Sequence, residues 1–263
     1  MSRESGKKSA VVAGEGFSGS TDSIETFLER LRDRCKDDGG CDGLDRPGRI
    51  QVEAERALAL ADEFGIVKRP SFGWEEFLRG EPDLWIGTEH LVDLSVPEKR
   101  YRKTTIPPAF GLVPRVVEIP TVNLRGDPDI PATRRVIEFV HATPLEYLER
   151  WAASNAVFDD DVRLVSVIHW QDGPVSFGIS QPQYHGVPAE YRDIERCFSE
   201  AGWTRLKDPS GHVIFFNYAF GVMAIDAERR NCYLTDGQLQ PFDVILCRPD
   251  AAMQAFLAIY PDS

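Results

Sequence analysis

The sequence predicts an α+β protein, with one folded domain that follows an N-terminal helical extension. Apolar residues recur at helical spacing from about residue 21 to residue 80, strand-like alternation starts at Leu84, and hairpins and helices then alternate to the C-terminus. The chain has 263 residues, of which 42% are apolar, and a chain of this size buries a substantial core. We therefore expect a folded protein that mixes helices with antiparallel strands.

The charge and hydropathy of the chain disfavour two classes of binding partner, nucleic acids and membranes. The formal net charge is -12, which disfavours nucleic acid as a direct ligand. No apolar run is long enough to cross a membrane, and the apolar stretch near the N-terminus is too short for a signal peptide, so we expect a soluble, cytoplasmic protein without a membrane partner. The cysteines are scattered and odd in number, and we expect free thiols at Cys35, Cys41, Cys197, Cys232 and Cys247.

The N-terminal part is expected to be a leader followed by helices. Residues 1–20 are rich in Ser, Gly and charge, which predicts a disordered leader. The extension at 21–80 contains three expected helices, in TDSIETFLERLRDRC, IQVEAERALALADEFG and SFGWEEFLRG. The first begins at a Thr or Asp cap, and the second ends at Gly65. We expect these helices to pack on the following domain or on a partner.

The first half of the domain is predicted to be two hairpins separated by a helix. The first hairpin lies in LWIGTEHLVDLSVPEKRYRKTTIP and turns at 95–99. A further strand is predicted at 115–124, followed by a loop in RGDPDIPATR. Thr143 and Pro144 introduce the helix LEYLERWAASNAVF, because Thr caps a helix and Pro suits its first position. The second hairpin, in VRLVSVIHWQDGPVSFGISQ, turns at its Asp-Gly pair.

The second half begins after Pro182. We expect a helix in PAEYRDIERCFSEAG and two strands around the turn in TRLKDPSGHVIFFNYAFGVMAID. A hairpin in CYLTDGQLQPF and a last helix in DAAMQAFLAIY complete the predicted order.

Three polar residues interrupt the mostly apolar stretch AIDAERRNCYLTDGQLQPFDVIL. Asp226 and Asn231 have the D-x4-N spacing of a kinase catalytic loop, and Asp243 follows the next hairpin, at the place of a metal-binding aspartate. In this chemistry Asp226 orients or deprotonates the acceptor hydroxyl, while Asn231 and Asp243 supply oxygen ligands to Mg²⁺. The alternative is an ordinary turn, in which Asp and Asn are common.

Phosphoryl transfer also needs a cation on the nucleotide phosphates and a carboxylate that holds this cation. Lys103, in RYRKTT near the end of the first hairpin, is the candidate lysine, and Glu149 on the following helix is its expected partner. Glu146 is the alternative partner, although its position in the first turn is explained by the helix dipole. Taken alone, Lys103 would be a solvated strand lysine.

Few groups are available to bind the nucleotide itself. The G-x-G-x-x-G pattern of a phosphate-covering loop is reduced to Gly87. Residues 178–183 are the candidate hinge, which would accept adenine through backbone groups around Ser180 and Gln181. The alternative for this segment is an ordinary strand end. We expect ATP and Mg²⁺ as the cofactors.

The sequence resembles the serine/threonine/tyrosine kinase-like domains of polyvalent proteins from phages and mobile elements. The segments that carry the resemblance are GTEHLVDL with RYRKTTIPPAFG, ATPLEYLERWAASNAVFDDDVRL, ISQPQYHG and IDAERRNCYLTDGQLQPFDVI. The resemblance implies a minimal protein-kinase-like two-lobed fold at 81–263, with an N-lobe at about 81–181 and a reduced C-lobe at about 182–263. It also implies ATP- and Mg²⁺-dependent transfer of a phosphoryl group to a hydroxyl, with a protein as the expected acceptor.

Departures from the kinase pattern keep two alternatives open. Ala224 and Ile225 replace the usual His-Arg before Asp226, and Asp243 is followed by Val-Ile where kinases have Phe-Gly. Only about twenty residues follow Asp243, which leaves no room for an activation segment. One alternative is a pseudokinase or nucleotide-binding module of a phage, mobile-element or defence system. The other is a non-kinase protein with a coincidental motif.

Overall fold

A computed structural model describes residues 23–37, 41, 43–80, 85–121 and 132–260. The described chain is a mixture of helices and antiparallel strands, which confirms the predicted α+β class. It divides into two compact units, the first formed by residues up to 112 and 141–183, and the second by 113–140 and 184–263. The predicted leader at 1–20 lies outside the described residues. No helix in the described ranges has the length and apolar character that a membrane span requires.

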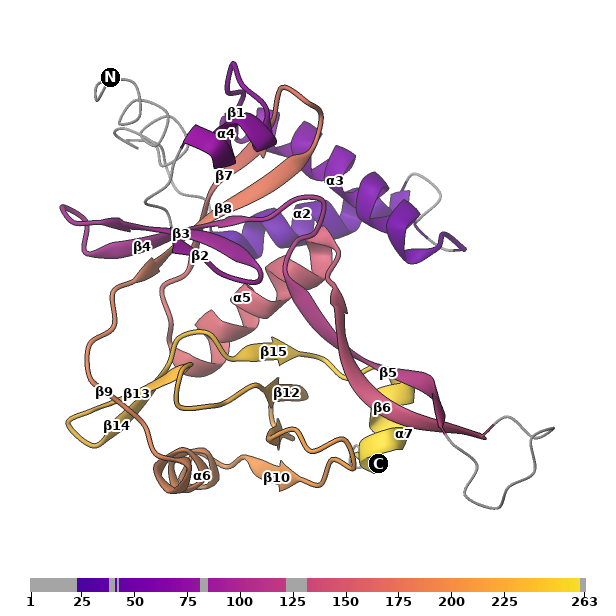
Figure 1. The fold of residues 1–263 in the computed structure, drawn as a ribbon, viewed down its shortest axis with the longest axis vertical. Coiled ribbons are helices and arrows are strands. Elements are labelled where there is room, and N and C mark those ends of the chain that lie inside the picture. Colours follow the sequence, from indigo (N-terminus) through magenta and orange to yellow (C-terminus); the bar gives the residue numbers. More distant parts are fainter. Residues whose placement is uncertain (1–22, 38–40, 42, 81–84, 122–131, 261–263) are drawn as a thin grey trace. The chain divides into compact units, whose positions relative to one another are not determined.

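Four helices belong to the first unit. They are α2 (Ile24–Asp37), α3 (Arg46–Glu63), α4 (Trp74–Gly80) and α5 (Pro144–Phe158), each where the sequence predicts one (Figure 1). The cap of α2 differs from the expected Thr or Asp, because Ser23 Oγ accepts a hydrogen bond from the Thr26 amide at 3.2 Å. At α5 the predicted cap is confirmed, since Thr143 and Glu146 form a complete capping box and Pro144 occupies the first turn.

The first unit contains a six-stranded sheet in the order β1-β7-β8-β4-β3-β2. Its strands are β1 (Val67–Lys68), β2 (Trp85–Ile86), β3 (His90–Ser95), β4 (Arg100–Thr105), β7 (Arg163–His169) and β8 (Val175–Pro182). β1 is parallel to β7, and the other neighbours are antiparallel. Both predicted hairpins are confirmed, as β3–β4 and β7–β8.

Helices α2, α3 and α5 cover one face of this sheet (Figure 1). Their apolar residues form one core with strand residues of β7 and β8, including the fully buried Phe177 and Ile179. The opposite face packs against α4, where Trp74, Phe77 and Trp170 form an aromatic cluster. The extension is therefore part of the first unit, because its helices supply much of the core beneath the sheet.

The second unit is built from short strands and two helices. Its four-stranded sheet has the order β10-β11-β12-β15, a three-stranded sheet has the order β14-β13-β9, and β5 pairs with β6. The elements are β5 (Leu112–Thr121), β6 (Ala132–His141), β9 (Val187–Pro188), α6 (Tyr191–Glu200), β10 (Thr204–Leu206), β11 (Ile214–Asn217), β12 (Val222–Ile225), β13 (Cys232–Thr235), β14 (Gln238–Pro241), β15 (Ile245–Cys247) and α7 (Ala251–Leu257).

Two features of the second unit differ from the sequence analysis. β6 begins at Ala132, so the end of the predicted loop RGDPDIPATR belongs to a strand, and the rest of that loop lies outside the described residues. β5 and β6 are assigned to the second unit, whereas the sequence analysis places them in the first lobe. The expected helices α6 and α7 and the hairpin β13–β14 are present as predicted.

Candidate functional site

Lys103 lies on β4, in the middle of the sheet of the first unit. Its neighbours across the sheet are Val92 on β3 and Ile179 on β8. Because directly opposed residues of antiparallel strands point to the same face, Lys103 shares its face with Ile179, which packs into the core beneath α5. The lysine is only 7% exposed, and its Nζ lies 5.1 Å from the centroid of the Trp151 ring. The alternative interpretation of Lys103, as a solvent-exposed strand lysine, is therefore wrong.

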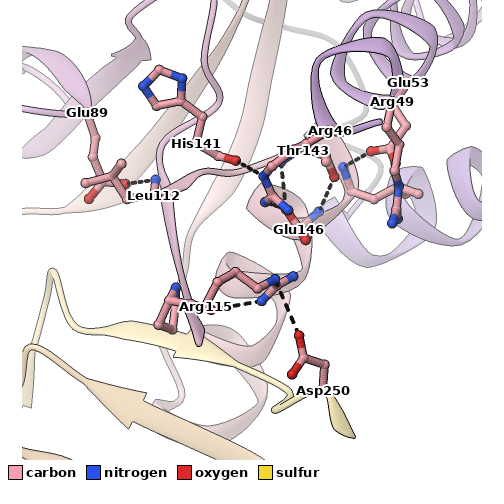
Figure 2. A network of polar contacts seen from close by, with 12 residues as sticks. Arg46, Arg49, Glu53, Glu89, Leu112, Arg115, His141, Thr143, Glu146 and Asp250 are labelled. Atoms are coloured by element: carbon pink, nitrogen blue, oxygen red, sulfur yellow. Dashed lines mark hydrogen bonds and ion pairs between the residues drawn. The ribbon is translucent and has the colours of Figure 1, made fainter. Parts of the chain in front are cut away.

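The structure places both glutamates of α5 beside arginines of the extension. The Glu149 carboxylate accepts two hydrogen bonds from Arg32 on α2, at 2.8 and 3.2 Å. Glu146 closes the capping box by accepting a hydrogen bond from the Thr143 amide at 2.8 Å, and it also pairs with Arg46 of α3 (Figure 2). The carboxylate of Glu149 therefore pairs with Arg32 and not with Lys103 as expected, while Trp151 of α5 lies near Lys103.

The candidate nucleotide-binding residues lie within regular structure. The Gly87 amide donates to the His90 carbonyl at 2.8 Å and so closes the turn between β2 and β3. Ser180 is buried and its Oγ accepts a hydrogen bond from Arg100 at 2.6 Å, while the side-chain carboxamide of Gln181 donates to the Asp160 carboxylate at 3.1 Å. Strand β8 pairs with β4 through this segment as far as its end, so the candidate hinge at 178–183 is largely strand.

Asp226 and Asn231 are joined directly in the second unit. Asp226 follows β12 and has a left-handed backbone with φ of 64°. The Asn231 carboxamide nitrogen donates to the Asp226 carbonyl and to its carboxylate Oδ2, each at 2.8 Å. Arg230 donates to the other carboxylate oxygen at 2.7 Å, and this hydrogen bond raises the pKa of the arginine.

Strand pairing places Asp243 at the end of the four-stranded sheet where Asp226 also lies. β12 pairs antiparallel with β15, with Ile225 opposite Ile245. The residues just after β12 and those just before β15 therefore lie at the same end of this strand pair. The amide of Phe242 donates to the Asn231 carbonyl at 3.0 Å. The hairpin β13–β14 therefore starts beside Asp226 and Asn231 and ends beside Asp243. The backbone positions of Asp226, Asn231 and Asp243 therefore lie at the same end of this sheet, joined by the hairpin β13–β14.

Several buried polar contacts near Trp151 were not predicted from the sequence. Arg150, 2% exposed in its side chain, pairs with Glu89 at 2.7 Å, and the Glu89 carboxylate also accepts the Leu112 amide at 2.7 Å (Figure 2). His90 Nε2 lies 2.9 Å from the Tyr147 hydroxyl, inside the core. The helical period places Tyr147 on a buried stripe, but nothing in the local pattern indicates a buried ion pair at Glu89.

The described residues contain no group of three or more His, Cys, Asp and Glu side chains arranged to hold a metal ion. The oxygen donors of Asn231 and Asp243 are of the type that Mg²⁺ prefers, and they would share it with nucleotide phosphates and water. Comparisons of the chain with protein-family models, with curated proteins and with solved structures give no match.

Proposed function

We propose that the chain is a minimal protein-kinase-like phosphotransferase, which moves the γ-phosphoryl group of ATP to a hydroxyl on a protein. The observation that carries this proposal is the return of Asp243 to the loop of Asp226 and Asn231. Phosphoryl transfer needs an acceptor-orienting carboxylate next to oxygen ligands for magnesium, and the pairing of β12 with β15 supports the proposal because it puts these residues at one end of the sheet. A chance D-x4-N turn would carry no reason for a second aspartate at the same edge.

The first unit supports the same assignment independently. A lysine on a central strand faces the helix that follows the first hairpin, and the second hairpin completes the sheet on the other side. The order hairpin, helix, hairpin is the one that an N-lobe needs in order to place a phosphate lysine between the strands and the helix that connects the hairpins, although here α2 and α3 cover the same face of the sheet. Lys103 would neutralise nucleotide phosphates in this proposal, and the sheet would be the N-lobe.

The chemistry assigned to the second unit is simple. The acceptor hydroxyl oxygen forms a bond to the γ-phosphorus, the bond to the β–γ bridging oxygen breaks, and ADP leaves with that electron pair. Asp226 orients the hydroxyl and takes its proton, while Asn231 and the arginine at 230 hold the carboxylate in place. Mg²⁺, where bound by Asn231 and Asp243, would offset the charge that develops on the phosphates.

A pseudokinase that binds nucleotide without turnover is the second candidate. The ion pair between Arg230 and Asp226 favours it, because Arg230 already occupies one oxygen of the carboxylate that would accept the hydroxyl proton. The loss of all but Gly87 from the glycine-rich pattern also favours it. ATP binding without any production of ADP would support this candidate over the enzyme.

Phosphate transfer from radiolabelled ATP tests the proposal. We expect the wild type to label itself or an added protein in the presence of Mg²⁺, and we expect Asp226→Asn and Asp243→Ala to abolish labelling. The matched control is Asp236→Asn, because Asp236 is exposed in the turn of the intervening hairpin and should tolerate the change. Equal labelling by the wild type and Asp243→Ala would refute the proposal.

A further inference from the structure

Trp151 is a residue of α5 whose ring faces Lys103. The buried residues Tyr147, Trp151 and Ser154 follow one another at helical spacing and form the stripe of α5 that packs toward the sheet. Glu149 is two positions from Trp151, about 200° around the helix, which is why it reaches Arg32 on α2. A carboxylate at 149 consequently lies on the wrong side of the helix for the lysine.

The indole ring is held firmly by its surroundings. Trp151 is 1% exposed, and its ring packs edge-on against Tyr147 at 6.1 Å and near His90 at 6.3 Å. Arg150 also lies over the ring, 4.8 Å from its centroid, and is itself anchored by Glu89. A ring fixed on several sides presents its π-face to a neighbouring cation at little entropic cost.

We propose that Trp151 is a positioning residue for Lys103, and that α5 orients the phosphate lysine through this aromatic face. The distance of 5.1 Å from Nζ to the ring centroid is within the range of a cation–π contact. Burial strengthens such a contact because water does not compete for the ammonium. The inference deepens the proposed function, since orienting Lys103 matters for phosphate binding, and that part rests on the proposed function.

Fluorinated tryptophans test the contact without changing the volume of the core. Introduction of mono-, di-, tri- and tetrafluorotryptophan at position 151 alone withdraws electrons from the ring stepwise and weakens cation–π attraction. The matched control is the same series at Trp170, which is also 1% exposed and lies in the aromatic cluster on the opposite face of the sheet. Thermal unfolding of each variant shows whether the fold is kept.

The first readout does not depend on activity. Acetic anhydride labelling of Lys103 is measured by mass spectrometry relative to Lys99, which is exposed at the turn of the same hairpin. We expect the labelling of Lys103 to rise with each added fluorine at 151 and to stay constant in the series at 170. Labelling that is the same at all fluorination levels of position 151 would overturn the inference.

The second readout is the dissociation constant of MgATP. We expect it to rise about tenfold across the series at 151, the factor that corresponds to a desolvated cation–π contact. The series at 170 should leave the constant unchanged. If labelling of Lys103 responds to fluorination while the wild type binds no ATP, the contact is supported and the proposed function fails. If ATP binds and both series at 151 and 170 give the same constant, the positioning role fails while the proposed function stands.

Discussion

Glu53 on α3 fixes the start of α5, and its replacement should loosen the helix that faces Lys103. The side chain of Glu53 is fully buried. One carboxylate oxygen accepts the Leu145 amide at 3.0 Å, in the first turn of α5, and the other accepts Arg49 Nε at 2.8 Å. The carboxylate therefore satisfies a backbone donor at a helix N-terminus, where the helix dipole also favours negative charge.

The expected cost follows from these contacts. A hydrogen bond to a charged acceptor contributes about 1.5–3 kcal/mol, and the dipole at a partly buried helix end adds up to about 2 kcal/mol. Arg49 is 43% exposed, so it returns to water on loss of its partner and adds little. We expect Glu53→Ala to lower the free energy of unfolding by about 3 kcal/mol, and Glu53→Gln by about 1–2 kcal/mol, because a neutral oxygen still accepts the Leu145 amide.

Urea unfolding combined with hydrogen exchange measures this effect. Exchange at the first amides of α5 should accelerate more in Glu53→Gln than exchange in α6, which lies in the other unit. Glu55→Gln is the matched control, because Glu55 is two positions away on the same helix and is exposed, and its hydrogen bond is with the exposed side chain of Gln51. The same unfolding midpoint and the same exchange for Glu53→Gln and Glu55→Gln would refute the reasoning.

Three further predictions concern single titratable or polar groups. Asn231→Asp places a carboxylate 2.8 Å from that of Asp226, so its melting temperature should fall at pH 7 and recover toward about pH 4; a drop that is independent of pH would contradict this. Burial raises the pKa of Cys232 to about 12, and iodoacetamide at pH 8 should modify it at least about a hundredfold more slowly than the less buried Cys41, as measured by mass spectrometry. Burial lowers the pKa of Lys68 from its ordinary value of 10.5 to about 8. Between these two pH values the unfolded chain binds more protons than the folded chain, so the free energy of unfolding should rise with pH. This rise should be smaller in Lys68→Met.

Local signals explain why so much of the fold was predictable. The start of α5 is specified by Thr143, Pro144 and Glu146, three neighbouring residues whose capping box forms within one turn. The turn at Asp236 is likewise local, since the aspartate and the following glycine both have positive φ, as a tight hairpin requires. Such features depend on near neighbours only, and the chain around them therefore follows the sequence pattern.

The remaining features depend on partners that are distant in sequence. β6 begins at Ala132 because it pairs with β5, and neither strand has an alternation that is strong enough to predict its partner. Arg32, which takes the carboxylate of Glu149, lies 117 positions away along the chain. Helical spacing shows that Glu149 and Trp151 face different sides, but only the packing of α2 determines which side faces the sheet.

The helices of the extension consequently decide what Lys103 meets. Leu28 and Leu31 of α2 share one core with Leu148 and Trp151 of α5, so α2 fixes the rotation of α5 by burying its apolar side. Rotation of α5 that brought Glu149 toward the sheet would expose these leucines and would break the ion pair with the extension. The apolar core contributes more to the free energy of unfolding than one half-exposed ion pair does. Each fully buried leucine contributes about 1.5–3 kcal/mol, whereas an exposed ion pair contributes at most about 1 kcal/mol. The aromatic neighbour that α5 gives to Lys103 is thus a consequence of packing by the helices of the extension.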